Sequence, residues 1–264
     1  MPEFVVSGLN IYPVKSLKPL PVNYAEVDHF GFRFDRRFVL VDREGTFISQ
    51  RKYPILSQLR ADFDGEALCI SSTAFAELRF LIDEFVSPSK VSVWSDTVAA
   101  LILQDARTQV LSEFLGVSIS LAYMPDTAFR QVDRKFFDVE QPVSFADGFP
   151  FLLANQVSLN DLNSKLNVPV GMERFRPNIV FEGDLAFQED EWQRIKVGEV
   201  GFQLVKPCSR CVMTCIDEQG IRQKEPLKTL ASYRKNEFGV CFGQNMVQLN
   251  AGKIALGDKL RVVC

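Results

Sequence analysis

The most informative stretch of this sequence is Lys206-Pro207-Cys208-Ser209-Arg210-Cys211-Val212-Met213-Thr214-Cys215-Ile216-Asp217. It holds a C-x-x-C pair and a third cysteine four residues later, and Cys241 follows further on. Four thiolates could bind zinc or an iron–sulfur cluster, and the spacing alone does not select between them. If Cys211 to Ile216 form a strand, Cys211 and Cys215 share one face about 13 Å apart, too far to share a ligand. Cys215 is then expected to be a packing residue.

The chain has six cysteines and one histidine, His29. Catalytic triads, zinc-bound water sites and histidine general bases need imidazole, so a metal site here must be built on sulfur or oxygen. Clustered cysteines in a chain of this kind indicate metal binding or catalysis more often than disulfides. The isolated Cys69, Cys241 and Cys264 are expected to be small packing residues, because free cysteine is among the most buried residue types.

Composition and charge exclude several classes of protein. The 47% hydrophobic content of 264 residues is enough for one large or two modest domains. A net charge of −3 and a pI near 5.4 leave no general attraction to nucleic acid. The longest apolar stretches, such as residues 98–103, are far shorter than the roughly 20 residues of a membrane helix. Without a signal-like start, the protein is expected to be cytoplasmic, with neither nucleic acid nor a membrane as partner.

Short apolar runs between Gly, Pro and Asp residues predict a mainly β structure. Expected strands cover residues 4–12, 37–42, 91–95, 98–103, 178–182 and 199–205. One helix is expected over 105–115, capped by Asp105 and ended by Gly116. A second should start at Ser158, and a third should have Pro226 at its first helical position. A domain boundary is expected near residue 125, where a strand-like run gives way to a polar stretch.

Motifs along nearly the whole chain resemble those of the MOSC-domain family. The string around Cys211 is similar to the family's cysteine signature, in particular that of the mitochondrial amidoxime-reducing component and its bacterial relatives. The other matching motifs, in family order, are residues 11–16, 35–41, 144–150, 175–179, 224–227, 232–234 and 242–244. The resemblance implies an α+β, predominantly β fold: a MOSC-type β-barrel (126–264) packed against an N-terminal β-rich domain (1–125), with a few short helices.

The resemblance also implies a cofactor, the molybdenum cofactor (Mo-molybdopterin), in which one protein thiolate binds the metal. That ligand carries over to Cys211, which is then both the metal-binding and the catalytic residue, and a soft thiolate suits such a centre. Arginine and lysine suit the anionic phosphate of the pterin, so a net-acidic chain could assemble a basic pocket. The implied cofactor-binding residues are Lys15, Ser16, Arg37, Asp147, Gly148, Arg176, Asn178, Ser209, Arg210 and Asn245.

Two positions depart from the family pattern. Cys215 stands where relatives commonly carry threonine, and either packs or adds a second thiol near the metal. Asn245 replaces an aromatic residue found near the cofactor in some relatives, which leaves substrate preference open. Asp147 and Asp217 are candidate proton carriers, although a turn or capping role fits each equally well.

The activity that the resemblance implies is that of a molybdenum-dependent oxidoreductase that reduces N-hydroxylated small molecules. The sequence has no flavin or nicotinamide fingerprint, and no ferredoxin-like cysteine cluster follows Cys264, so a separate iron–sulfur or flavin protein is the expected electron donor. Two alternatives stay open. One is a non-catalytic carrier of the molybdenum cofactor or of sulfur, with a persulfide on Cys211. The other is a structural zinc module held by Cys208, Cys211, Cys215 and Cys241.

Overall fold

The largest unit of the structure, a computed structural model that describes residues 3–263, is a barrel of seven strands. The strands follow the order β12-β13-β1-β19-β14-β15-β17, and pairing of β12 with β17 closes the ring. Only the β12–β13 pair is parallel among these neighbours. The strands are β1 (Glu3–Ile11), β12 (Phe151–Asn155), β13 (Ile179–Glu182), β14 (Arg194–Val197), β15 (Val200–Ser209), β17 (Gly239–Gln248) and β19 (Lys259–Val263), with β2 (Leu20–Pro21) beside β1 and β16 (Lys235–Asn236) beside β17.

The barrel forms because its strands alternate apolar and polar residues. In β1, Phe4 and Val6 are buried while their neighbours are exposed, the period of two that a half-buried strand requires. Phe151 packs edge-on against Phe202 at a ring separation of 5.0 Å inside the barrel. Each such fully buried side chain stabilises the fold by about 1.5–3 kcal/mol. The interior is therefore a packed core, so a ligand pocket must lie outside it.

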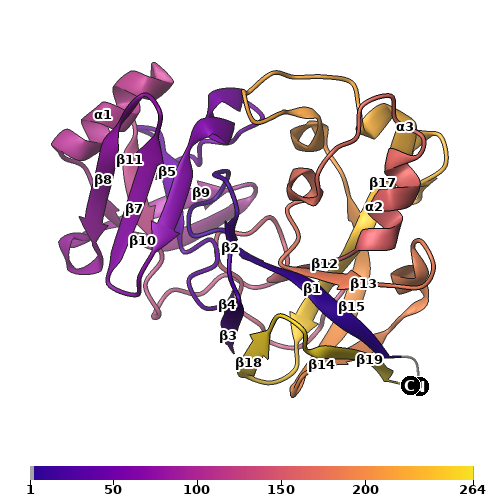
Figure 1. Ribbon diagram of the computed structural model, residues 1–264. Helices are drawn as coiled ribbons and strands as arrows, with labels where there is room; N and C mark the ends of the chain where they lie inside the picture. Colours follow the sequence, from indigo (N-terminus) through magenta and orange to yellow (C-terminus); the bar gives the residue numbers. More distant parts are fainter. Residues whose placement is uncertain (1–2, 264) are drawn as a thin grey trace.

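Three smaller sheets complete the fold and lie mostly to one side of the barrel (Figure 1). The four-stranded sheet has the order β5-β11-β10-β9, and the three-stranded sheets have the orders β6-β7-β8 and β18-β3-β4. Their strands are β3 (Tyr24–Asp28), β4 (Gly31–Phe32), β5 (Phe38–Val41), β6 (Arg60–Phe63), β7 (Ala67–Ser72), β8 (Phe75–Leu81), β9 (Ser87–Val93), β10 (Asp96–Leu103), β11 (Ser120–Tyr123) and β18 (Gly252–Ala255). The predicted α+β, predominantly β fold is confirmed.

The first helix confirms its sequence prediction. Helix α1 (Ala106–Leu115) begins after Asp105, whose carboxylate accepts the backbone N–H groups of Arg107 and Thr108. It ends at Gly116, which has a left-handed φ of 68° that glycine adopts without strain.

The other two helices correct their predicted starts. Helix α2 (Gln156–Asn163) is capped by Asn155, because the Asn155 side chain accepts the N–H of Val157. The Ser158 hydroxyl, expected to be the cap, is buried within the helix and accepts the N–H of Phe187 instead. In α3 (Leu227–Ala231), Pro226 is the residue before the first helical position and not the first position itself.

The predicted strands are found with shifted ends, and the strand considered for Cys211 to Ile216 is absent. Strand β15 continues to Ser209, beyond the expected residue 205, and β9 ends at Val93 because Trp94 turns with a φ of 57°. Residues Val212–Cys215 form a 3-10 turn, η5, and not a strand. The alternation argument for Cys211 and Cys215 is therefore wrong in its geometry.

The two halves of the chain exchange strands. Strand β1 lies in the barrel between β13 and β19, and β3 pairs with β18, so early segments complete sheets whose other strands come late. The domain boundary at residue 125 stays a prediction. Within residues 3–263, no helix has the length and apolar character needed to cross a membrane.

Candidate functional site

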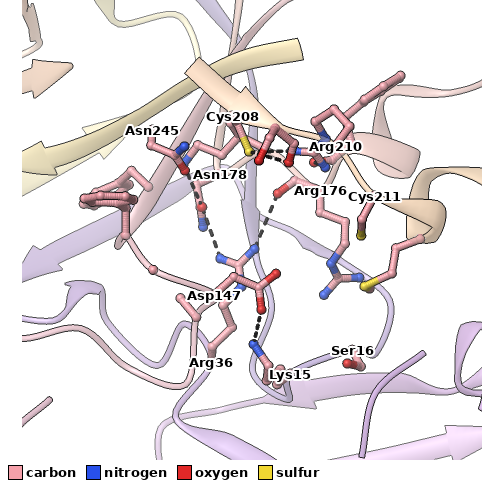
Figure 2. Close-up of a pocket in the computed structure, with 18 of the residues that line it drawn as sticks. Lys15, Ser16, Arg36, Asp147, Arg176, Asn178, Cys208, Arg210, Cys211 and Asn245 are labelled. Atoms are coloured by element: carbon pink, nitrogen blue, oxygen red, sulfur yellow. Dashed lines mark hydrogen bonds and ion pairs between the residues drawn. The ribbon is translucent and has the colours of Figure 1, made fainter. Parts of the chain in front are cut away.

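A pocket of about 240 Å³ lies beside the barrel and is lined from both halves of the chain (Figure 2). Its walls come from the segment after β1, from Arg36, and from the loops around residues 47–51 and 146–149. The far wall is made by residues 175–178, by the end of β15 with the following turn, and by Asn245 of β17. Segments distant in sequence therefore meet around one hollow.

Ten of the eleven residues expected to form a site line this pocket. They are Lys15, Ser16, Asp147, Gly148, Arg176, Asn178, Ser209, Arg210, Cys211 and Asn245. Their contact with a cofactor stays a prediction, but their placement in one hollow is a property of the fold.

Arg37 is the exception and lies outside the pocket lining. Its guanidinium is buried, stacks over the Phe30 ring at 4.3 Å, and donates to the carbonyl of Met124 (3.0 Å from Nε) and to Asp126 (2.8 Å). Arg36 is the last residue of a turn and has a left-handed φ of 51°, and its side chain lines the pocket, whereas that of Arg37 does not. The structure thus places Arg36, and not the expected Arg37, in the lining of this pocket.

Cys211 is held at the edge of the pocket by its own backbone. It immediately precedes η5, and its carbonyl accepts both the N–H (3.1 Å) and the hydroxyl (3.0 Å) of Thr214. The Nε of Arg174 donates to the Thr214 carbonyl at 2.8 Å, and the preceding N–H of Arg210 donates to Val240 at 2.7 Å. The turn is thus fixed on both sides, which leaves the half-buried thiol facing the pocket.

The other cysteines do not converge on one centre. Cys215 is buried and its thiol donates to the carbonyl of Lys224 at 3.5 Å, which fits the expected packing role. Cys241 is buried as expected, whereas Cys69 is only half-buried. Cys264 lies outside the described residues. In residues 3–263 no group of three or more His, Cys, Asp or Glu side chains is arranged to hold a metal ion, so the arrangement gives no support to the four-cysteine zinc site.

Positive charge dominates the pocket. Six cationic side chains and one carboxylate, Asp147, are found among its described lining residues. The cations are Lys15, Arg36, Arg51, Arg176, Lys206 and Arg210. Such a lining favours an anionic ligand.

Two of these cations are held in the pocket against the effect of burial. Burial lowers the pKa of Lys15 to about 8, although its ammonium lies 2.6 Å from the Asp147 carboxylate. Burial likewise lowers the pKa of Arg176 to about 10. The Asp147 side chain is exposed, and the neighbouring charge and hydrogen bond of Lys15 hold its pKa below its ordinary range. Both cations stay charged at pH 7, and an anionic ligand beside them would stabilise these charged forms.

A small network fixes the position of Arg176. The Tyr12 ring has the guanidinium of Arg36 at 4.3 Å and that of Arg176 at 4.4 Å from its centroid. Arg36 also donates to the side chain of Asn178 (3.1 Å) and forms an ion pair with the buried Asp35. Arg176 donates to the carbonyl of Leu17 at 2.7 Å. Figure 2 shows Arg36 between Asp147 and Asn178, which makes it a scaffold for the pocket.

Backbone strain is concentrated around this pocket. Three lining residues other than glycine have left-handed backbones: Ser16 (φ 72°), Arg36 (φ 51°) and Arg176 (φ 57°). Each such conformation costs on the order of 1–3 kcal/mol and persists where the surrounding structure demands it. Clustering of this kind is typical of ligand-binding sites.

Two protein-family models match this sequence. The MOSC domain matches residues 140–261, and the MOSC N-terminal beta barrel domain matches residues 3–118. The mitochondrial amidoxime-reducing component 1 of Homo sapiens is 33% identical over 276 residues, which cover 96% of this chain and 81% of the relative. This chain belongs to the MOSC-domain family.

Two further proteins are similar in sequence to this MOSC protein. The mitochondrial amidoxime reducing component 2 of Macaca fascicularis is 30% identical over 87% of the chain and 72% of the relative. The molybdenum cofactor sulfurase of Oryza sativa subsp. japonica is 30% identical over 96% of the chain, which corresponds to 33% of that longer protein. The family resemblance expected from the motifs is confirmed.

Several pocket residues of this MOSC protein were not expected from its sequence. Arg36 and Lys206 lie within or next to the quoted motifs, so their types were visible, but their direction was not. Phe47 and Arg51 come from a loop without a motif, and only the fold brings them to the pocket. Met213 lies two residues after Cys211, in the turn η5, and also lines the pocket.

Proposed function

We propose that this MOSC protein binds the molybdenum cofactor in the pocket through the Cys211 thiolate and reduces N-hydroxylated small molecules. One observation carries the proposal: the Cys211 thiol faces a pocket that six cationic side chains line. The names of the amidoxime-reducing relatives support the reductase activity. The thiol that would bind the metal and the cations that would bind an anion therefore line the same pocket.

The donors fit the chemistry of this cofactor. The Nε of Arg210 is buried without a hydrogen-bond partner among the described residues, and a ligand acceptor would satisfy it. Arginine presents a planar set of donors to phosphate, and Arg176 and Arg210 form no ion pair within residues 3–263. Cys211 supplies a soft sulfur ligand that suits a molybdenum centre. Arg176, Arg210, Lys15 and Cys211 are the residues that would hold it.

When bound, the cofactor would supply the two-electron chemistry of the reaction. Lys15 can carry a proton on Nζ at neutral pH and release it readily, because burial lowers its pKa to about 8. Asp147 stays ionised beside it, so it orients Lys15 and is not itself the proton donor. Asp217 accepts the N–H groups of Gln219 and Ile221 in a turn, the structural role considered for it.

The overall reaction balances with an external reductant. An N-hydroxylated substrate takes up two electrons and two protons, its N–O bond breaks, and the oxygen leaves as water. We propose that a separate iron–sulfur or flavin protein donates the electrons and that the reaction takes place in the cytoplasm. Reduction of substrate by NADH and this protein alone would contradict the separate donor.

Replacement of Cys211 tests the proposal. Protein expressed with molybdate should contain about one molybdenum per chain and reduce benzamidoxime with an artificial electron donor. Cys211→Ser should lose both, whereas Cys215→Ser, the matched control at a buried packing position, should keep both. Stoichiometric molybdenum in purified Cys211→Ser protein would show that the ligand is assigned wrongly.

The similarity to the cofactor sulfurase supports a second candidate, a carrier of the cofactor or of sulfur. A carrier would use the same pocket and the same thiol, but it would release its cargo to an acceptor protein. Molybdenum content together with benzamidoxime turnover favours the reductase. Molybdenum without turnover, or a persulfide on Cys211, favours the carrier.

A further inference from the structure

A second pocket, of about 500 Å³, shares a wall with the first. It is formed where the pocket-facing side chains of the β6–β7–β8 sheet meet the 3-10 turns η3 (Met172–Phe175) and η5 (Val212–Cys215). Arg176 and Met213 line both pockets. Met213 is two residues after Cys211, so the two hollows meet at the turn that carries the thiol.

The two pockets differ in charge. In the first, cationic side chains outnumber carboxylates six to one. The second is lined by four cationic side chains, by five carboxylates and by an apolar surface that includes Leu17, Leu20 and Ile216. Its carboxylates are Asp62, Glu77, Glu173, Asp217 and Glu218, and none of them forms an ion pair in the part of the chain that the structure describes.

The proposed reaction changes the charge of its substrate, so the charge of each pocket matters. An N-hydroxyamidine is a weak base and is neutral at pH 7, whereas the amidine formed from it is a strong base and becomes a cation. The substrate takes two electrons from the separate donor and two protons, loses its oxygen as water, and the amidine then takes a further proton from solvent. Each turnover therefore creates a positive charge on the product, which the carboxylates of the second pocket attract.

We infer that the second pocket binds the apolar body of the organic substrate and then accepts the cationic amidine product. The N-hydroxy group reaches past Met213 to the Cys211 side, while Asp62 and Glu77 attract the product away from it. These two carboxylates lie on β6 and β8, on either side of Cys69 and Ser71 of the central strand β7, and all four line the pocket. This inference rests on the proposed reductase function.

Benzamidine is a probe for the pocket that needs no turnover. Its dissociation constant for the molybdenum-loaded protein is measured by calorimetry at low salt. Asp62→Asn/Glu77→Gln should weaken binding about two- to thirtyfold, because exposed charge pairs contribute about 0.2–1 kcal/mol each. Glu66→Gln, an exposed carboxylate outside the pocket lining, is the matched control and should change nothing. Equal affinities of the double variant and wild type would overturn the product role.

A filled pocket tests the substrate role. Ser71→Trp places a large ring against the half-buried floor and should raise KM for benzamidoxime at least tenfold, with molybdenum content unchanged. Hydroxylamine, which has no organic body, should be reduced at the wild-type rate, and this rate also shows that the variant is folded. Equal effects on both substrates would overturn the inference. If wild type reduces neither substrate, the proposed function fails, and benzamidine binding still tests the pocket.

Discussion

Replacing Lys15 by methionine should stabilise the cofactor-free protein while it removes a cofactor contact. Lys15 is only 6% exposed, and its ammonium has the Asp147 carboxylate and the carbonyl of Phe145 (2.7 Å) as partners. These partners do not compensate for burial, because its pKa is lowered to about 8. Methionine fills a similar volume without a charge.

The size of the effect follows from the pKa. A lysine whose ordinary value of 10.5 falls to about 8 in the folded protein loses about 3 kcal/mol of folding free energy while it is charged. Lys15→Met should therefore raise the free energy of unfolding at pH 7 by up to about 3 kcal/mol. Between pH 8 and 10.5 the unfolded chain binds more protons at this position than the folded protein, so the stability of wild type should rise with pH. The variant should lack that rise.

Urea denaturation of cofactor-free protein at pH 7 and at pH 10 measures both effects. Lys52→Met, at an exposed lysine, is the control and should stay within about 0.5 kcal/mol of wild type. In protein expressed with molybdate, Lys15→Met should retain less molybdenum, the opposite direction to its stability. A lower free energy of unfolding for cofactor-free Lys15→Met at pH 7 would refute the reasoning.

Two further changes test parts of the fold outside the pocket. Glu189 is fully buried beside Asn155 and Ser158, and burial raises its pKa to about 7. Wild type should therefore lose about 3 kcal/mol of stability as the pH rises from about 4.5 to 7, because the folded protein must then ionise a buried carboxyl. Glu189→Gln should not show this loss. Urea denaturation at both pH values checks this, and parallel pH dependences would contradict it. Arg37→Met should lower the free energy of unfolding by about 2 kcal/mol through its lost bonds to Met124, while folded protein keeps its molybdenum. Metal analysis checks the second statement, and selective loss of molybdenum would return Arg37 to the site.

Local signals predicted some elements well and others poorly. Helix α1 was predictable because Asp105 and Gly116 fix its two ends through backbone chemistry. The start of α2 was not, because Asn155 and Ser158 both carry oxygen acceptors and only the fold decides which of them is buried. The turn after Cys211 is likewise set by tertiary bonds, such as that from Arg174 to Thr214, that no local pattern contains.

The site was predictable in its residue types and less so in its directions. Motif order identified Lys15, Arg176 and Cys211, and the fold gathers them in one pocket. The sequence did not show that Arg36 rather than Arg37 lines the pocket, because Arg36 lies in a turn with a left-handed φ of 51° that no local pattern indicates. The sequence shows the side-chain types of two adjacent residues, but contacts with distant parts of the chain decide which of the two side chains lines a pocket.

The place of β1 in the barrel has a consequence for biosynthesis. Its two main neighbours, β13 and β19, are made by residues 179–182 and 259–263, so its β13 edge cannot pair before residue 179 is made, nor its β19 edge before residue 259. Pairings of such long sequence separation form slowly and leave apolar edges open to aggregation meanwhile. The barrel therefore cannot be completed before β19 is made, and a chaperone that shields Phe4 and Val6 should raise the yield of folded protein.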